Sequence, residues 1–227
     1  RGTGLRNDAA KFGYIYSERA PYEMLGNDLM PFGDIVRIKR VEDVLEKFWN
    51  AHRMDRTIEY LVGSAYPSPF DFFQAFGDYW EERGWQRIGH QLEDLFVRIW
   101  SFLKEDANPA LDLDVTLGLL KIDYFLQHKY KPRKIWWEDR MDKDAWSGHL
   151  KAAAERLGLD QRELAKKAVL EYVPFDYAAW SGEGRIDREN GTLLAVLYGG
   201  EETPPQLLAL PSPLGKAQLS EAGKPIE

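Results

Sequence analysis

Apolar residues recur at three- and four-residue steps through most of the chain from residue 34 onward. The first such stripe consists of Ile35, Ile38, Val41, Leu45, Phe48 and Trp49. Because an α-helix turns once every 3.6 residues, this spacing places the apolar side chains on one helical face. Similar stripes begin near residues 70, 92, 113 and 146. The pattern predicts a mainly α fold, a bundle-like array of about six or seven helices.

Local signals mark the ends of several of these helices. A serine, asparagine or aspartate followed by proline, or by glutamate three positions later, is typical of a helix start. Such signals stand at Ser68, Asn108 and Asp160. Glycine is typical of a helix end and occurs at Gly84 and Gly158. We expect the helix that begins after Asp160 to continue to about Tyr172.

The composition changes after Pro174. The segments FDYAAW (175–180) and TLLAVLY (192–198) are rich in aromatic and apolar residues and enclose a glycine-rich polar loop. They predict a small C-terminal β-hairpin, with a further short strand at Leu207–Leu210. The sequence thus divides into a connector over 1–33, a helical domain over 34–172, a small β element over 173–210 and a flexible tail over 211–227.

The overall charge argues against two classes of protein. A net charge of −7 is the wrong sign for a chain that mainly coats nucleic acid or an anionic membrane. The sequence has no apolar run of the ~20 residues that a membrane span requires, and it starts without a signal-peptide pattern. We therefore expect a cytoplasmic protein. Because the chain begins at Arg1 rather than at methionine, we also expect it to be a fragment of a longer one.

Chemistry-bearing motifs are scarce. The chain contains no cysteine, which removes disulfides, thiolate zinc sites and a self-contained iron–sulfur cluster. The glycine-rich stretches match neither the dinucleotide-binding nor the P-loop pattern. Four histidines fall in different predicted helices without the spacing of metal ligands: His52, His90, His128 and His149. The sequence therefore predicts no metal site and no catalytic residue of its own.

The segment KYKPRKIWW (129–137) combines four cations with three aromatic residues. Such a mixture is found where proteins bind single-stranded nucleic acid, because bases stack on aromatic rings. Four acidic residues between 138 and 144 offset the charge, however. Pro132 also favours extended geometry at Lys131. We therefore interpret the segment as a linker between helices, and nucleic acid is not the expected partner.

Four blocks of the sequence resemble segments of cobalamin-binding radical SAM proteins. GTGLRNDAAKFGYIYSERAPYEML (2–25) resembles the exit from the radical SAM barrel, where Gly2 and Thr3 match a GT-x-L/I-R motif. VEDVLEKFWNAHRMDRTIEYL (41–61) resembles the helix that follows. SPFDFFQAFGDYWEERGW (68–85) and LLKIDYFLQHKYKPRKIW (119–136) resemble two later blocks in the same order. The family resembled is a helical C-terminal domain of unknown function in these Fe–S oxidoreductase-like enzymes.

The resemblance implies a parent enzyme with further domains and cofactors. It would carry a cobalamin-binding domain and a radical SAM barrel, with a 4Fe–4S cluster in a CxxxCxxC loop and S-adenosylmethionine as cosubstrate. The chain itself would hold none of these cofactors. Its partners would be those two N-terminal domains and a small-molecule substrate of unknown identity.

Two hypotheses about function follow. In the first, the chain is an accessory domain that caps the barrel of such an enzyme and helps to bind its substrate. The candidate contacts to an anionic substrate are then Lys131 and Arg133, with Trp136 or Trp137 packing beside them. In the second, the chain is a non-enzymatic helical module that docks RNA or a protein through the same linker. Salt dependence of RNA binding would separate the two.

Overall fold

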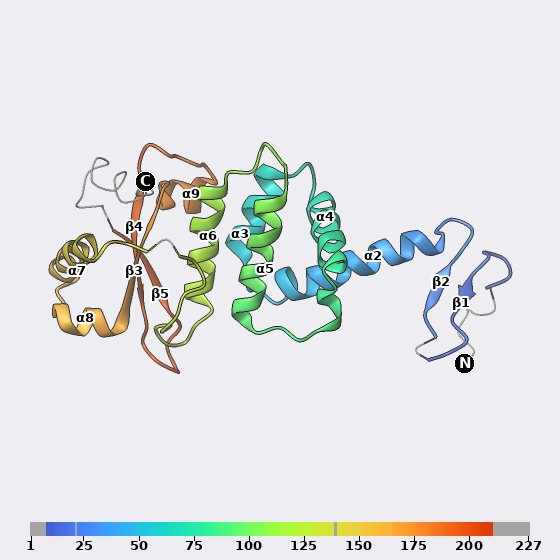
Figure 1. The fold of residues 1–227 in the computed structure, drawn as a ribbon, viewed down its shortest axis with the longest axis horizontal. Helices are drawn as coiled ribbons and strands as arrows, with labels where there is room; N and C mark the ends of the chain where they lie inside the picture. The colour runs from blue at the N-terminus through green and yellow to red at the C-terminus, as the bar shows by residue number, and fades with distance from the viewer. Residues whose placement is uncertain (1–7, 21, 139, 211–227) are drawn as a thin grey trace. The chain divides into compact units, whose positions relative to one another are not determined.

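The computed structural model describes residues 8–20, 22–138 and 140–210 (Figure 1). The predicted tail over 211–227 and the residues Gly2 and Thr3, which match a barrel-exit motif by resemblance, lie outside these ranges. The described residues form two compact units. The first contains the chain up to His52 together with Tyr66–Gly89, and the second contains Arg53–Ala65 and the chain from His90 onward.

The first unit is built on two packed helices. Strands β1 (Ile15–Tyr16) and β2 (Met24–Gly26) pair antiparallel and precede α2 (Phe32–Leu45), which continues into a wider turn, η1 (Glu46–Asn50). After the excursion into the second unit come α4 (Pro69–Glu82) and the short 3-10 turn η3 (Trp85–Arg87). The core between α2 and α4 is aromatic and includes Phe48, Phe72, Phe76 and Trp80.

The predicted ends of α4 are confirmed. The Ser68 side chain accepts a hydrogen bond from the Asp71 backbone N–H, and Pro69 occupies the first helical position. At the other end, Gly84 takes a left-handed conformation with φ of 70°, which a residue with a side chain adopts at a cost. These two residues therefore mark where the helix that carries the aromatic stripe begins and ends.

The second unit combines helices with a three-stranded antiparallel sheet. Its first helices are α3 (Asp55–Tyr60), the wider turn η2 (Leu61–Ala65), α5 (Leu92–Glu105) and α6 (Leu113–Leu126). The later elements are α7 (Lys143–Leu157), α8 (Gln161–Lys167), β3 (Ala168–Val173), α9 (Tyr177–Glu183), β4 (Thr192–Leu197) and β5 (Gln206–Leu210). The strands lie in the order β3-β4-β5, with Leu170 opposite Ala195 and Ala195 opposite Leu208.

Helices cover both faces of this sheet (Figure 1). Ala168 and Leu170 of β3 belong to a buried cluster with Leu150 of α7 and Leu164 of α8. The alternate β3 residues face α6, where the Lys121 ammonium bonds the Glu171 carboxylate at 3.1 Å. Because successive strand residues point to opposite faces, α6 and the α7–α8 pair must lie on opposite sides.

Three predictions about these elements are wrong. The helix after Asp160 ends at Lys167, and residues 168–173 form a strand. The segment 175–180, predicted as a strand, begins helix α9 instead, so the sheet has three strands in place of a hairpin. The helix predicted from Asn108 starts only at Leu113, capped by Asp112. The fold is thus largely helical, with a mixed α/β second unit.

Both wrong assignments near the sheet have a physical cause. Strand β3 is buried on both faces, so its residues show no alternation of polar and apolar side chains. Helix α9 is started by the Asp176 side chain, which accepts bonds from the backbone N–H groups of Ala178 and Ala179. In the described part of the chain, no helix has the length and apolar character to cross a membrane.

A candidate ligand cavity at Arg56

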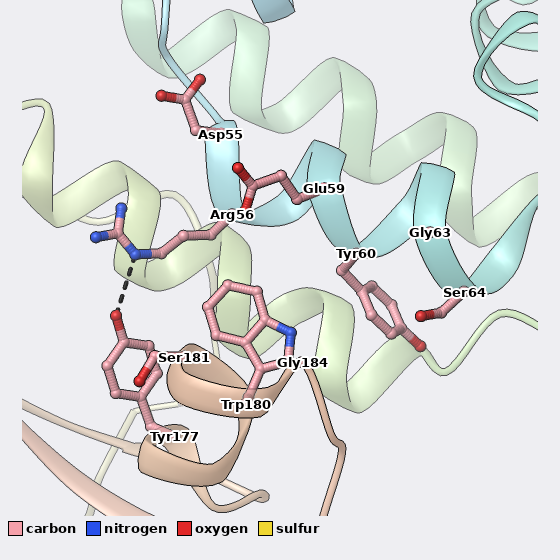
Figure 2. Close-up of a pocket in the computed structure, with 10 residues that line it drawn as sticks. All are labelled: Asp55, Arg56, Glu59, Tyr60, Gly63, Ser64, Tyr177, Trp180, Ser181 and Gly184. Atoms are coloured by element: carbon pink, nitrogen blue, oxygen red, sulfur yellow. Dashed lines mark hydrogen bonds between the residues drawn. The ribbon is translucent and has the colours of Figure 1, made fainter.

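A solvent-open cavity of about 690 Å³ lies between α3–η2 and α9 in the second unit (Figure 2). Six of its lining residues come from one helical face: Asp55, Arg56, Glu59, Tyr60, Gly63 and Ser64. The other four come from α9 and its C-terminal cap: Tyr177, Trp180, Ser181 and Gly184. Both sets repeat at three- and four-residue steps, so each helix presents a single polar and aromatic face to the cavity.

Arg56 is held in place at one end of the cavity. Its Nε donates to the Tyr177 hydroxyl at 3.1 Å (Figure 2), and its Nη1 donates to the Asp123 carboxylate at 3.4 Å. Burial lowers the pKa of Arg56, but the Tyr177 hydrogen bond and the Asp123 charge outweigh it and leave the pKa raised. Nη2 makes no hydrogen bond to the described residues, so the guanidinium retains donors for a ligand.

Asp123 on α6 holds Arg56 and the adjacent Thr57 of α3 in place. Its side chain is almost fully buried and accepts hydrogen bonds from the Thr57 backbone N–H at 2.9 Å and the Thr57 hydroxyl at 2.8 Å. Burial raises the pKa of Asp123 to about 6, while the Thr57 and Arg56 contacts act in the opposite direction. At neutral pH the carboxylate is therefore mostly ionised and orients the Arg56 side chain.

The remaining walls offer stacking surface and hydroxyl groups. Trp180 lies on the α9 side with its ring 5.8 Å from that of Tyr177. Burial raises the pKa of Tyr60, which keeps its hydroxyl neutral. Ser64 and Ser181 add hydroxyls on opposite sides of the cavity. The cavity can therefore hold a small polar ligand by one cation, flat aromatic faces and several hydrogen-bonding groups.

The four substrate contacts predicted from sequence lie elsewhere in the second unit. None of Lys131, Arg133, Trp136 and Trp137 lines the Arg56 cavity. The Lys131 ammonium donates to the Ala165 carbonyl at 2.7 Å, and burial lowers its pKa. Arg133 is exposed. One of the cations of the linker, Lys131, therefore forms a contact within the fold.

The two tryptophans of the linker also act as packing residues. Only 5% of Trp137 is exposed, and its ring lies 5.2 Å from Phe125 and 5.6 Å from Tyr124. Trp136 is half-buried and packs 6.3 Å from Phe96. The structure brings the two indoles together at 5.4 Å, but as anchors of the segment against α5 and α6. The prediction that residues 129–137 form a linker between helices is confirmed.

Sequence reasoning missed Arg56, Asp123, Tyr177 and Trp180. Their signal was present in part, since Arg56 and Asp123 lie inside two of the four sequence blocks, 41–61 and 119–136, that were singled out from the sequence. What hid the site was the assignment of 175–180 to a strand. A strand would have placed Tyr177 and Trp180 on opposite faces, whereas helical spacing places them on one.

Within the described ranges, no group of three or more histidine, cysteine, aspartate and glutamate residues is placed to hold a metal ion. The chain also has no cysteine to supply the thiolates of an iron–sulfur cluster. Any such cluster would need ligands from outside these 227 residues.

Fold and cavity together define a largely helical domain with a ligand-sized cavity around an anchored arginine. A family model described as "Protein of unknown function (DUF4080)" matches residues 10–195. The chain therefore belongs to this family. No curated protein and no solved structure matches it.

Proposed function

We propose that the chain is a substrate-binding accessory domain of a cobalamin-dependent radical SAM enzyme. The parent class rests on the four sequence blocks that resemble such enzymes between residues 2 and 136. The absence of cysteine fits this role, because the chemistry would then reside in cofactors bound by other domains. A domain of this kind contributes binding energy and excludes water from the reacting groups.

The observation that carries the binding role is the anchored guanidinium of Arg56. A buried carboxylate and a tyrosine fix its orientation, while Nη2 forms no hydrogen bond to the described residues. Fixing a cation before the ligand arrives reduces the entropy that binding would otherwise lose. The cavity is thus a better candidate for substrate contact than the linker, where Lys131 is engaged by Ala165.

The test uses the full-length enzyme, identified by a CxxxCxxC loop encoded upstream in the same reading frame. We expect Arg56→Gln to lower kcat/KM by about 10- to 100-fold, since it removes a charge-assisted bond worth about 1.5–3 kcal/mol. Arg56→Lys retains the charge but loses the fork of donors, and we expect an intermediate loss. Unfolding temperatures of both variants report any loss of stability.

Arg133→Gln is the matched control, because Arg133 is an exposed arginine on the linker. We expect its kcat/KM to equal that of the unaltered enzyme. A loss with Arg133→Gln and none with Arg56→Gln would move substrate binding to residues 129–137 and contradict the proposal.

The rival hypothesis of an RNA-docking linker has less support. Of the three aromatic residues in 129–137, only Tyr130 is exposed, at 59%. Trp137 is packed in the core, and Lys131 bonds a backbone carbonyl. One exposed ring is left for stacking, although Lys129, Arg133 and Lys134 stay exposed for phosphate contact. RNA binding that weakens steeply with salt would restore this hypothesis.

A further inference from the structure

The charges around the cavity do not suit a simple anion. Arg56 supplies one positive charge, but Asp55 and Glu59 line the same cavity with two carboxylates. Glu59 stands three residues from Arg56 on the same helical face, so the two charged groups are neighbours. A ligand that brings only negative charge would be attracted by Arg56 and repelled by Glu59.

Glu59 is also available to a ligand. Its side chain is exposed and forms no hydrogen bond or ion pair with the residues that the structure describes. Nothing in the packing of α3 requires a carboxylate at this position. Glu59 lines the cavity from α3, on the same helix as Arg56 (Figure 2).

Trp180 adds a second feature that favours a cation. Its indole lies on the α9 side of the cavity, opposite the side chains of α3 (Figure 2). The face of a tryptophan ring attracts ammonium groups, and more strongly than tyrosine or phenylalanine. Glu59 and Trp180 line the same cavity, so a carboxylate and an aromatic ring are both available to a positive group there.

We propose that the cavity binds a small zwitterion, a molecule that carries both a carboxylate and an ammonium group. The carboxylate pairs with the guanidinium of Arg56, and the ammonium lies between Glu59 and the face of Trp180. Amino acids and their derivatives belong to this chemical class. The inference rests on the proposed function in one respect, which is that the Arg56 cavity is a ligand site.

Three probes of equal chain length test the proposal by calorimetric titration of the 227-residue chain. These are 6-aminohexanoate with both charges, hexanoate with the negative charge alone, and hexylamine with the positive charge alone. We expect 6-aminohexanoate to bind at least about 10-fold more tightly than either of the others, because it alone satisfies both sides. Hexanoate binding as tightly as 6-aminohexanoate would overturn the zwitterion assignment.

Glu59→Gln separates the two charges, and Glu155→Gln is its control at an exposed position on α7. We expect Glu59→Gln to weaken 6-aminohexanoate binding by about 5-fold and to strengthen hexanoate binding, since it removes a repulsive carboxylate. Equal behaviour of the two variants would overturn the inference. The proposed function fails separately, if Arg56→Gln leaves turnover of the full-length enzyme unchanged.

Discussion

Asp123 is not among the lining residues of the cavity, but it orients Arg56, which is. It receives two hydrogen bonds from Thr57 and faces the guanidinium of Arg56 at 3.4 Å. An isolated carboxylate at this depth would be costly, and these partners make it tolerable. The same residue therefore fixes α6 to α3 and orients the guanidinium of Arg56 at the cavity.

The raised pKa of Asp123 predicts a specific pH dependence of stability. The folded pKa of about 6 lies above the ordinary value of 3.8, so the folded state holds this proton more tightly. Stability from Asp123 is therefore present at about pH 4 and is lost as the pH rises through 6. At about 1.4 kcal/mol per pKa unit, the loss is roughly 3 kcal/mol.

Comparison of the unaltered chain with Asp123→Asn by chemical denaturation measures this loss. We expect the unaltered chain to lose stability relative to the variant between pH 4 and pH 6.5. Asp142→Asn is a control of opposite sign when the titration is extended to lower pH. Backbone N–H groups of Ala145 and Asp144 lower the pKa of Asp142, so its stabilising contribution is lost as the pH falls below the ordinary value of 3.8. A stability difference for Asp123→Asn that is constant, or that grows with pH, would contradict the burial effect.

The element that organises the second unit is α6, which packs closely on the sheet. A side chain at Gly118 would meet Phe175 at 2.9 Å and Val173 at 3.2 Å, so only glycine permits this approach. Gly148 in α7 contrasts with it, because a Cβ there would meet nothing within 4 Å. The two glycines thus have different roles in helices of similar length.

This contrast predicts opposite effects of the same substitution. We expect Gly118→Ala to lower the free energy of unfolding by about 1–3 kcal/mol through overpacking. Gly148→Ala should raise it by up to about 1 kcal/mol, because alanine has the higher helix propensity. Denaturant titrations of the two variants give the comparison, and effects of equal sign would show that α6 does not pack on the sheet at this distance.

Elements with a one-sided apolar pattern could be predicted from the sequence, and those without one could not. The stripes of α2, α4, α5 and α7 face a core on one side and solvent on the other, so their period is visible. Strand β3 is short and buried on both faces, so tertiary burial decides it and no alternating pattern is visible. Helix α9 has no buried residue, and its start depends on the local cap at Asp176.

For the whole molecule, the chain order conceals which residues gather at the cavity. Arg56, Asp123 and Tyr177 are each more than fifty residues apart, and the cavity exists only when α3, α6 and α9 meet. The linker 129–137 stands out in the sequence because it combines cations with aromatic residues. Lys131 and Trp137, however, make contacts that stabilise the fold. Because the residues of this site are dispersed along the chain and form no local motif, the site could be located only from the three-dimensional structure.

We expect ligands to bind at Arg56 rather than at the linker 129–137. The indole N–H signals of the eight tryptophans allow a direct test by NMR on the 227-residue chain. Titration with 6-aminohexanoate or hexanoate should shift the Trp180 signal, assigned with a Trp180→Phe variant, and leave Trp136 and Trp137 in place. Shifts confined to Trp136 or Trp137, or no shift of Trp180 with either probe, would contradict the account.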